Sequence, residues 1–97
     1  MRLIISPSAR SDLVDIADFI GQEAPIRAQS FVEELYEACA ELTRAPLRFA
    51  KVDVPVADLR RRIHGRYSIF YRVSREKIEI VRIVSSARDL ARLFPDD

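Results

Sequence analysis

Prolines and a glycine divide the first half of the chain into two stretches whose apolar residues recur at helical spacing. The first stretch begins at Pro7, a residue that fits the first turn of a helix, and ends at Gly21. The second begins at Pro25 and runs to about Ala45, where Pro46 forbids its continuation. Each stretch has one apolar face to bury, so the sequence predicts a helical hairpin that packs against another layer.

Acidic residues mark the faces of these helices that we expect to be exposed to water. Asp12, Asp15 and Asp18 lie outside the apolar stripe of the first helix. Such residues are more typical of a solvated surface than of a paired-carboxylate site. Cys39 lies within the apolar stripe of the second helix, and we interpret it as a small core residue.

Three β-prone runs occupy residues 59–64, 67–73 and 77–85, and His64-Gly65 separates the first two. Glycine tolerates the positive φ of a tight turn, so these two runs predict a β-hairpin. Alternation within the middle run assigns its residues to two faces of a sheet. One face carries Tyr67, Ile69, Tyr71 and Val73, and the other carries Ser68, Phe70 and Arg72.

The last two runs suggest a register for their pairing. In that register Arg72 meets Glu79 across the strands, and an opposite-charge pair of this kind contributes roughly a few tenths of a kcal/mol. The same register places Arg82 on the apolar face, opposite Ile69. Either a β-bulge or a carboxylate of the first helix, such as Asp15, would then have to accommodate the guanidinium.

Together with a short strand at residues 2–5, these elements predict an α+β fold with the order β-α-α-β-β-β. The helical hairpin would pack on one face of a small, mostly antiparallel sheet. Residues 86–94 predict a short C-terminal helical turn anchored by Leu90, Leu93 and Phe94. The 97 residues are the size of a single domain.

The composition excludes several classes of function. No apolar run approaches the roughly 20 residues that a membrane helix needs, and the N-terminal apolar run is too short for a signal peptide. The single cysteine precludes an internal disulfide, which fits the cytoplasm. One His and two Gly provide neither a metal-ligand cluster nor a phosphate-binding glycine loop. We therefore expect no metal, no cofactor, no membrane partner and no catalytic residue, and we interpret His64 as a turn residue.

Arginines are concentrated around the predicted hairpin turn, at Arg60, Arg61, Arg62 and Arg66. Residues 60–97 hold 10 Lys or Arg against 5 Asp or Glu, so the C-terminal part of the chain is basic. The arginines favour one of two interpretations: a solvated edge that keeps the sheet from pairing with other chains, or a patch that binds an anionic partner. Without a general base, such a patch provides electrostatic stabilisation but no proton transfer.

One motif spans the whole hairpin and reads Leu59-Arg60-x-x-x-x-Gly65-Arg66-Tyr67-x-Ile69-Phe70-Tyr71-Arg72-Val73. Three other segments accompany it: Ala9-x-x-Asp12-Leu13-x-x-Ile16, Ala28-x-x-Phe31 and Ile80-Val81-Arg82-Ile83-Val84. Together they resemble the signature of the ParE/RelE superfamily of toxins from type II toxin–antitoxin systems. The resemblance covers nearly the whole chain, and it implies the fold of that superfamily and a role as a toxin.

The superfamily has two branches with different activities. RelE-like members are ribosome-dependent mRNA endonucleases, whereas ParE-like members lack the nuclease residues and poison DNA gyrase. Three positions of the nuclease pattern are replaced in this chain: the arginine by Ser68, the histidine by Ser85 and the tyrosine by Phe94. Its two remaining basic positions are matched by Arg61 and Arg88. Loss of the groups that would move a proton favours the ParE-like branch. The alternatives are a RelE-like endonuclease that uses its remaining arginines, and a non-toxic module that only binds an antitoxin.

The resemblance also implies partners. A ParD-like antitoxin would hold the toxin through a disordered, acidic C-terminal segment that folds on binding, and this heteromer would bind operator DNA through the antitoxin. DNA gyrase would be the target. We expect apolar side chains of the loop at 46–58 to be exposed and to accept apolar anchors of the antitoxin. The candidates for contact with target or antitoxin are Arg60, Arg61, Arg62, Arg66, Arg72, Arg88, Phe49, Val52 and Val54.

Overall fold

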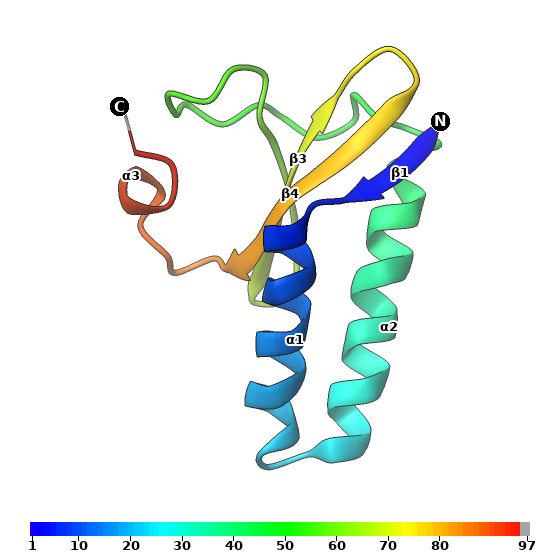
Figure 1. Ribbon diagram of the computed structural model, residues 1–97, viewed down its shortest axis with the longest axis vertical. Coiled ribbons are helices and arrows are strands. Elements are labelled where there is room, and N and C mark those ends of the chain that lie inside the picture. The colour runs from blue at the N-terminus through cyan, green and yellow to red at the C-terminus, as the bar shows by residue number, and fades with distance from the viewer. Residues whose placement is uncertain (96–97) are drawn as a thin grey trace.

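Two helices lie against one face of a four-stranded sheet (Figure 1). The computed structural model describes residues 1–95. Its elements are β1 (Arg2–Ile5), α1 (Pro7–Gly21), α2 (Pro25–Glu41), β2 (Arg60–His64), β3 (Tyr67–Val73), β4 (Lys77–Ser85) and α3 (Leu90–Leu93). The strand order is β1-β4-β3-β2, with β1 parallel to β4 and the other two pairs antiparallel. The predicted α+β fold and the order of its elements are confirmed.

Ser6 joins the start of α1 to the sheet. Its Oγ accepts a hydrogen bond from the Ala9 amide at 3.1 Å, which caps the helix. The same hydroxyl donates to the carbonyl oxygen of Val81 in β4 at 2.9 Å. These two bonds fix the point at which the chain leaves β1 and enters the helix.

The second helix is shorter than predicted. It ends at Glu41, about one turn before the expected end near Ala45. The next three amide groups each donate to the carbonyl three residues back, so the helix tightens and stops. The Thr43 hydroxyl also donates to the carbonyl of Ala40 at 2.7 Å. Pro46 therefore sets an outer limit for α2 and does not determine where the helix ends.

The register between β3 and β4 agrees with the prediction at one end and departs from it at the other. Arg72 faces Glu79, and Arg72 Nη2 donates to Glu79 Oε1 at 2.9 Å. Further along, the register shifts by one residue at a bulge in β4, so that Arg82 faces Phe70. The predicted pairing of Arg82 with Ile69 is therefore wrong, because the sheet adopts the bulge that was one of the two expected ways to accommodate this arginine.

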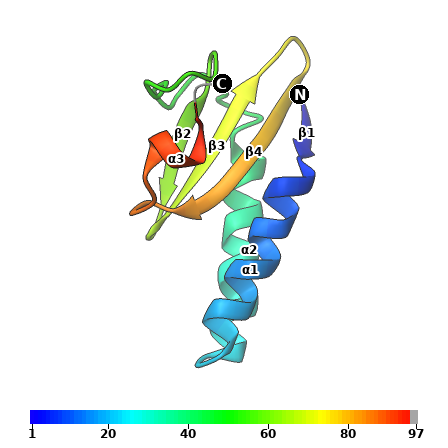
Figure 2. The same ribbon diagram turned by 60° about the vertical axis from the view of Figure 1, so that its left-hand side comes forward.

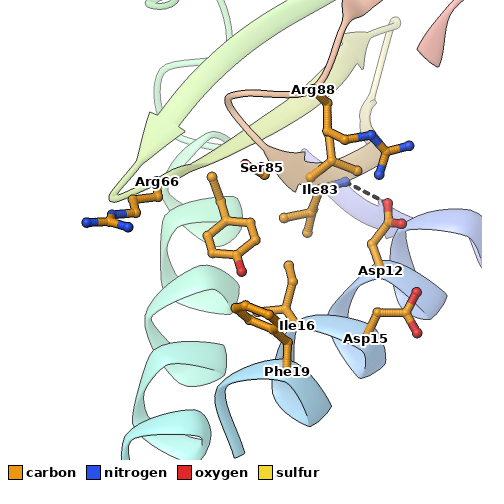
Figure 3. A pocket seen from close by; sticks show the side chains of 10 residues that line it. Asp12, Asp15, Ile16, Phe19, Arg66, Ile83, Ser85 and Arg88 are labelled. Atoms are coloured by element: carbon orange, nitrogen blue, oxygen red, sulfur yellow. Dashed lines mark hydrogen bonds between the residues drawn. The ribbon is translucent and has the colours of Figure 1, made fainter. Parts of the chain in front are cut away.

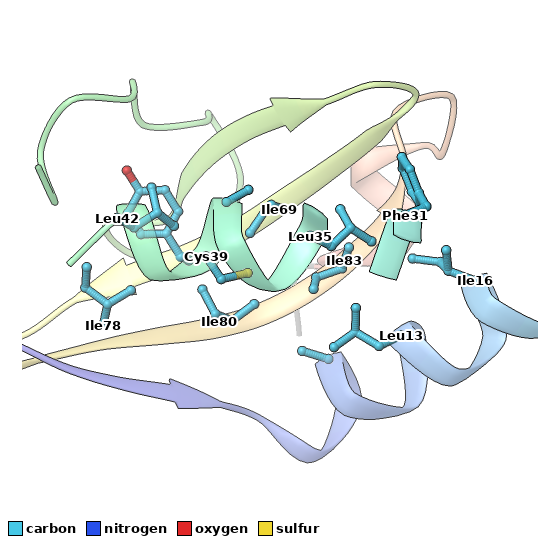
Figure 4. Close-up of a cluster of buried hydrophobic side chains, with 13 residues drawn as sticks. Leu13, Ile16, Phe31, Leu35, Cys39, Leu42, Ile69, Ile78, Ile80 and Ile83 are labelled. Atoms are coloured by element: carbon cyan, nitrogen blue, oxygen red, sulfur yellow. The ribbon is translucent and has the colours of Figure 1, made fainter. Parts of the chain in front are cut away.

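Apolar side chains cover both faces of the sheet. The larger cluster, here called the helix-side core, lies between the helices and the sheet (Figure 4), and it includes Leu35, Ile69, Tyr71, Ile78 and Ile80, which are fully buried. The smaller cluster, here called the outer-face core, comprises Leu59, Phe70, Val84 and Phe94, against which Val52, Val54, Val56, Leu90 and Leu93 pack. The loop before β2 and the C-terminal segment thus cover the face that the helices leave open. The helix α3 is shorter than the turn predicted over residues 86–94: it holds the predicted anchors Leu90 and Leu93, and the third anchor, Phe94, directly follows it.

The helices extend past one end of the sheet in both views (Figures 1 and 2). The projecting part consists of the C-terminal half of α1 and the N-terminal half of α2. One flank of α1 is consequently open beside the end of β4. Within residues 1–95, no helix is long and apolar enough to cross a membrane.

Candidate functional site

Two of the four hairpin arginines are used inside the protein. Arg62 Nη1 donates to the carbonyl oxygen of Ala38 at 2.8 Å, and Arg62 Nη2 lies 2.8 Å from Glu41 Oε1. A cation at this position also compensates the partial negative charge at the C-terminal end of α2. Arg60 Nη1 donates to the carbonyl oxygen of Phe49 at 2.7 Å. Arg62 therefore ties the C-terminal end of α2 to β2, and Arg60 ties the segment after α2 to β2.

The remaining basic candidates are more accessible. Arg66, at the hairpin turn, and Arg88, after β4, are exposed, and Arg61 is half-buried. None of these three guanidinium groups has a carboxylate partner among residues 1–95. Arg72 is exposed and paired with Glu79, and such a surface pair contributes little to stability. Of the six candidate arginines, three thus remain available to a partner.

The apolar candidates of the loop pack against the protein. Phe49 belongs to the periphery of the helix-side core, and the guanidinium groups of Arg48 and Arg62 lie 5.3 and 5.2 Å from the centre of its ring. Val52 and Val54 are half-buried and pack on the outer-face core. The expectation that these apolar side chains are exposed is wrong, because the outer face of the sheet is itself apolar and the loop is the segment that removes it from water.

His64 contacts the second helix at the end of β2. Its Nε2 lies 3.2 Å from Glu34 Oε1, and its ring centre is 5.6 Å from that of Phe31. Hydrogen bonds from Arg27 and, secondarily, from His64 lower the pKa of Glu34. Gly65 follows with a φ of 59°, the positive value expected for the turn. The histidine thus belongs to the packing of the hairpin on α2. Among residues 1–95, no three His, Cys, Asp or Glu side chains are placed to hold a metal ion.

The three positions of the nuclease pattern lie in or beside the hydrophobic core. Ser68 is fully buried, and its Oγ forms a hydrogen bond of 2.8 Å with Ser86 Oγ. Phe94 is 6% exposed and packs edge-on against Phe70, with 5.0 Å between the ring centres. Ser85 is half-buried at the end of β4. The first two positions are closed to solvent, so an RNA strand cannot reach them in this arrangement.

A groove of about 430 Å³ lies where the end of β4 meets α1 (Figure 3). Ile16 and Phe19 of α1 line one side, while Arg66 and Arg88 stand at two separate points of the rim. Phe19 is 67% exposed. The complete lining is Asp12, Asp15, Ile16, Phe19, Arg66, Tyr67, Ile83, Val84, Ser85 and Arg88. Sequence reasoning missed Phe19, although an aromatic residue directly after Asp18, outside the apolar stripe, was a signal for an exposed contact residue.

A buried ion pair forms one end of this groove. Asp12 accepts hydrogen bonds from Arg82 Nε at 2.8 Å, from Arg82 Nη2 at 2.9 Å and from the Ile83 amide at 2.8 Å. Asp12 is only 7% exposed, so the prediction that it lies on a solvated face is wrong. The carboxylate that accommodates Arg82 is that of Asp12 and not that of Asp15. The hydrogen bond to Asp12 raises the pKa of the Arg82 guanidinium.

Two helices on a four-stranded mixed sheet, with a short helix covering its other face, define a class of small α+β proteins that includes solved structures from toxin–antitoxin systems. A solved structure described as the chromosomal ParDE toxin–antitoxin system from P. aeruginosa is similar, with a TM-score of 0.75 and 25% identity over 88% of this chain and 95% of that chain. The toxin–antitoxin complex RelBE2 from Mycobacterium tuberculosis shares the fold, with a TM-score of 0.67 and 22% identity over 87% of this chain and 95% of that chain.

Family membership is more specific than the fold. The sequence model for the ParE toxin of the type II toxin–antitoxin system parDE matches residues 3–90. The chain therefore belongs to the ParE toxin family. A search of curated proteins found no match.

Proposed function

We propose that this toxin acts in the cytoplasm by binding and inhibiting DNA gyrase, without cleaving RNA. Membership of the ParE family supports the toxin role, since the matched region covers nearly the whole chain. The structural likeness to a ParDE system supports the ParE-like branch of the superfamily. The activity would then depend on surface contacts with the target and not on a catalytic centre.

The burial of Ser68 and Phe94 is the observation that carries this proposal. Cleavage of RNA by its own 2′-hydroxyl needs one group that takes up a proton and another that supplies one. At these two positions the chain has a hydroxyl bonded to Ser86 and a phenyl ring packed on Phe70. Neither side chain transfers protons at neutral pH, and neither faces the solvent.

The toxin would be held inactive by a ParD-like antitoxin. Both structural neighbours are toxin–antitoxin systems, which supports such a partner. We infer that the antitoxin has a disordered, acidic C-terminal segment that folds on the toxin, and that the complex binds operator DNA through the antitoxin. Arg61, Arg66 and Arg88, which have no carboxylate partner within the described residues 1–95, supply positive charge for such a segment.

A supercoiling assay tests the target. Purified toxin is added to gyrase and relaxed plasmid, and we expect loss of supercoiling that increases with toxin concentration. The same toxin mixed beforehand with the antitoxin encoded in the neighbouring reading frame is the control, and it should leave gyrase active. Unchanged supercoiling by a toxin that still stops growth would show that gyrase is not the target.

Primer extension on cellular mRNA after induction tests the competing activity. We expect induction of the toxin to produce no new mRNA 5′ ends at particular codons. Codon-dependent cuts that disappear in Arg88→Ala would instead establish a RelE-like endonuclease. Expression without any growth defect would point to a module that only binds its antitoxin.

A further inference from the structure

The groove between α1 and the end of β4 has the features of a docking site. The inference that follows rests on the proposed function, because it takes from it a partner with an acidic C-terminal segment. The volume of about 430 Å³ falls within the range of ligand pockets, roughly 300–1,000 Å³. The walls come from α1, β3 and β4, which are regular elements anchored in the helix-side core, so the site is largely formed before a partner arrives.

The apolar part of the groove is incompletely covered by the protein itself. Ile16 and Ile83 are buried at its base, whereas Phe19 is 67% exposed at its wall. Phe19 lies on the part of α1 that extends past the sheet, where no other element covers it (Figures 1 and 3). Aromatic side chains in such positions gain most from burial by a partner and are frequent anchors of interfaces.

Charge around the groove favours an acidic partner on the sheet side. Arg66 and Arg88 are exposed and have no carboxylate partner among residues 1–95. Asp12 is neutralised by Arg82 and is nearly buried, so it does not oppose an incoming carboxylate. Asp15 remains exposed on α1 and would repel one. A fitting segment therefore places its carboxylates toward the two arginines and keeps them away from α1.

We propose that this groove, and not the loop at 46–58, receives the acidic C-terminal segment of the antitoxin. One apolar side chain of that segment packs against Phe19 and Ile16. Acidic residues on either side of it pair with Arg66 and Arg88. The loop is a poorer site, because Val52 and Val54 already pack on the outer-face core and Phe49 on the helix-side core. Arg60 and Arg62 beside it are bonded internally.

Isothermal titration of purified toxin variants with the full-length antitoxin from the neighbouring reading frame tests this assignment. The groove variants are Phe19→Ala, Arg66→Glu and Arg88→Glu. The matched controls are Ile26→Ala, an apolar residue that is 86% exposed at the start of α2, and Arg75→Glu, an exposed arginine in the turn at the other end of β4. All five changes are at the surface, and circular dichroism before titration verifies that each variant is folded.

We expect each groove variant to weaken binding by about tenfold or more, and both controls to stay within about twofold of the wild type. For the two arginine variants the loss should shrink as salt is added, because exposed charges are screened. Groove variants that bind as tightly as the wild type would overturn the assignment while leaving the antitoxin partner in place. A wild-type toxin that does not bind the antitoxin would overturn the partner as well. Light scattering on the toxin alone tests whether a second copy of this chain occupies the groove instead. A toxin dimer that dissociates in the Phe19→Ala variant would assign the groove to that second copy and refute the proposal.

Discussion

The ion pair between α1 and β4 permits a quantitative prediction. Asp12 accepts three hydrogen bonds, two from Arg82 and one from the Ile83 amide, across 70 and 71 residues of sequence. In Asp12→Ala the guanidinium loses its counter-ion, and a buried amide of the sheet loses its acceptor. These two losses affect the same contact between helix and sheet, and both should appear in the free energy of unfolding.

The expected magnitude follows from the burial of each group. Removing one partner of a buried ion pair costs roughly 3–5 kcal/mol. The Arg82 side chain is 27% exposed and can turn partly toward water, so we reduce this to about 2 kcal/mol. A buried amide without an acceptor costs about 1–3 kcal/mol. Together these costs predict that Asp12→Ala loses about 3–5 kcal/mol, a large part of the roughly 5–15 kcal/mol that stabilises a small domain.

Urea unfolding followed by circular dichroism measures this loss. Asp12→Asn, which keeps an acceptor for the Ile83 amide but lacks the charge, should lose less than Asp12→Ala. Asp15→Ala is the matched control, because Asp15 is exposed one turn further along α1 and should change stability by less than about 0.5 kcal/mol. A loss below about 1 kcal/mol for Asp12→Ala, or an equal loss for Asp15→Ala, would refute the reasoning.

Three further predictions concern groups outside the groove. Arg62→Ala should lower the free energy of unfolding, measured in urea, by about 2 kcal/mol, because the variant lacks the charge-assisted bonds to Ala38 and Glu41. Wild-type stability in this variant would contradict the internal role of Arg62. Burial raises the pKa of the Cys39 thiol to about 12, so a disulfide reagent at mildly alkaline pH should modify only the unfolded protein; rapid modification of the folded protein would be inconsistent with this. The pKa of the Glu34 carboxyl is lower in the folded protein than in the unfolded chain, because Arg27 and His64 donate to it. The ionised carboxylate therefore contributes its full stabilisation above the unfolded-state pKa of about 4.3, and this contribution is lost as the pH falls through the folded-state pKa. The difference in Tm between wild type and Glu34→Gln should therefore shrink in acid, and a constant difference down to about pH 2 would contradict the shift.

The elements of the fold could be predicted because their signals are local. Pro7 and Gly21 bound the first helix, and alternation from Tyr67 to Val73 identified which side chains of β3 face the helices. The pairing of Arg72 with Glu79 followed from the same alternation. Each of these inferences depends on neighbours within a few residues, where steric and hydrogen-bonding preferences act directly on the backbone.

The candidate site could be predicted less well, because its contacts join distant parts of the chain. Asp12 has the sequence context of a solvated residue, and its partner Arg82 lies 70 residues further along the chain. The role of Arg60 depends on where the loop after α2 passes, and the role of Arg62 depends on how β2 packs against the end of α2. No local pattern specifies either. A long, flexible guanidinium group can donate to many acceptors, so composition identified a cluster of arginines without separating those bonded internally from those available to a partner.

The pairing of β1 with β4 has a consequence for how the toxin is made. The first strand of the sheet in chain order pairs with its fourth, and the Ser6 hydroxyl donates a hydrogen bond to the carbonyl of Val81. While the chain grows, the helical hairpin has no sheet on which to bury its apolar faces, since β3 and β4 come after it. Native pairing between segments so far apart must also overcome the entropy of a long loop. A ribosome that translates this message therefore carries no folded toxin domain until β4 has been made, and a product truncated before β4 lacks the strand that joins β1 to β3.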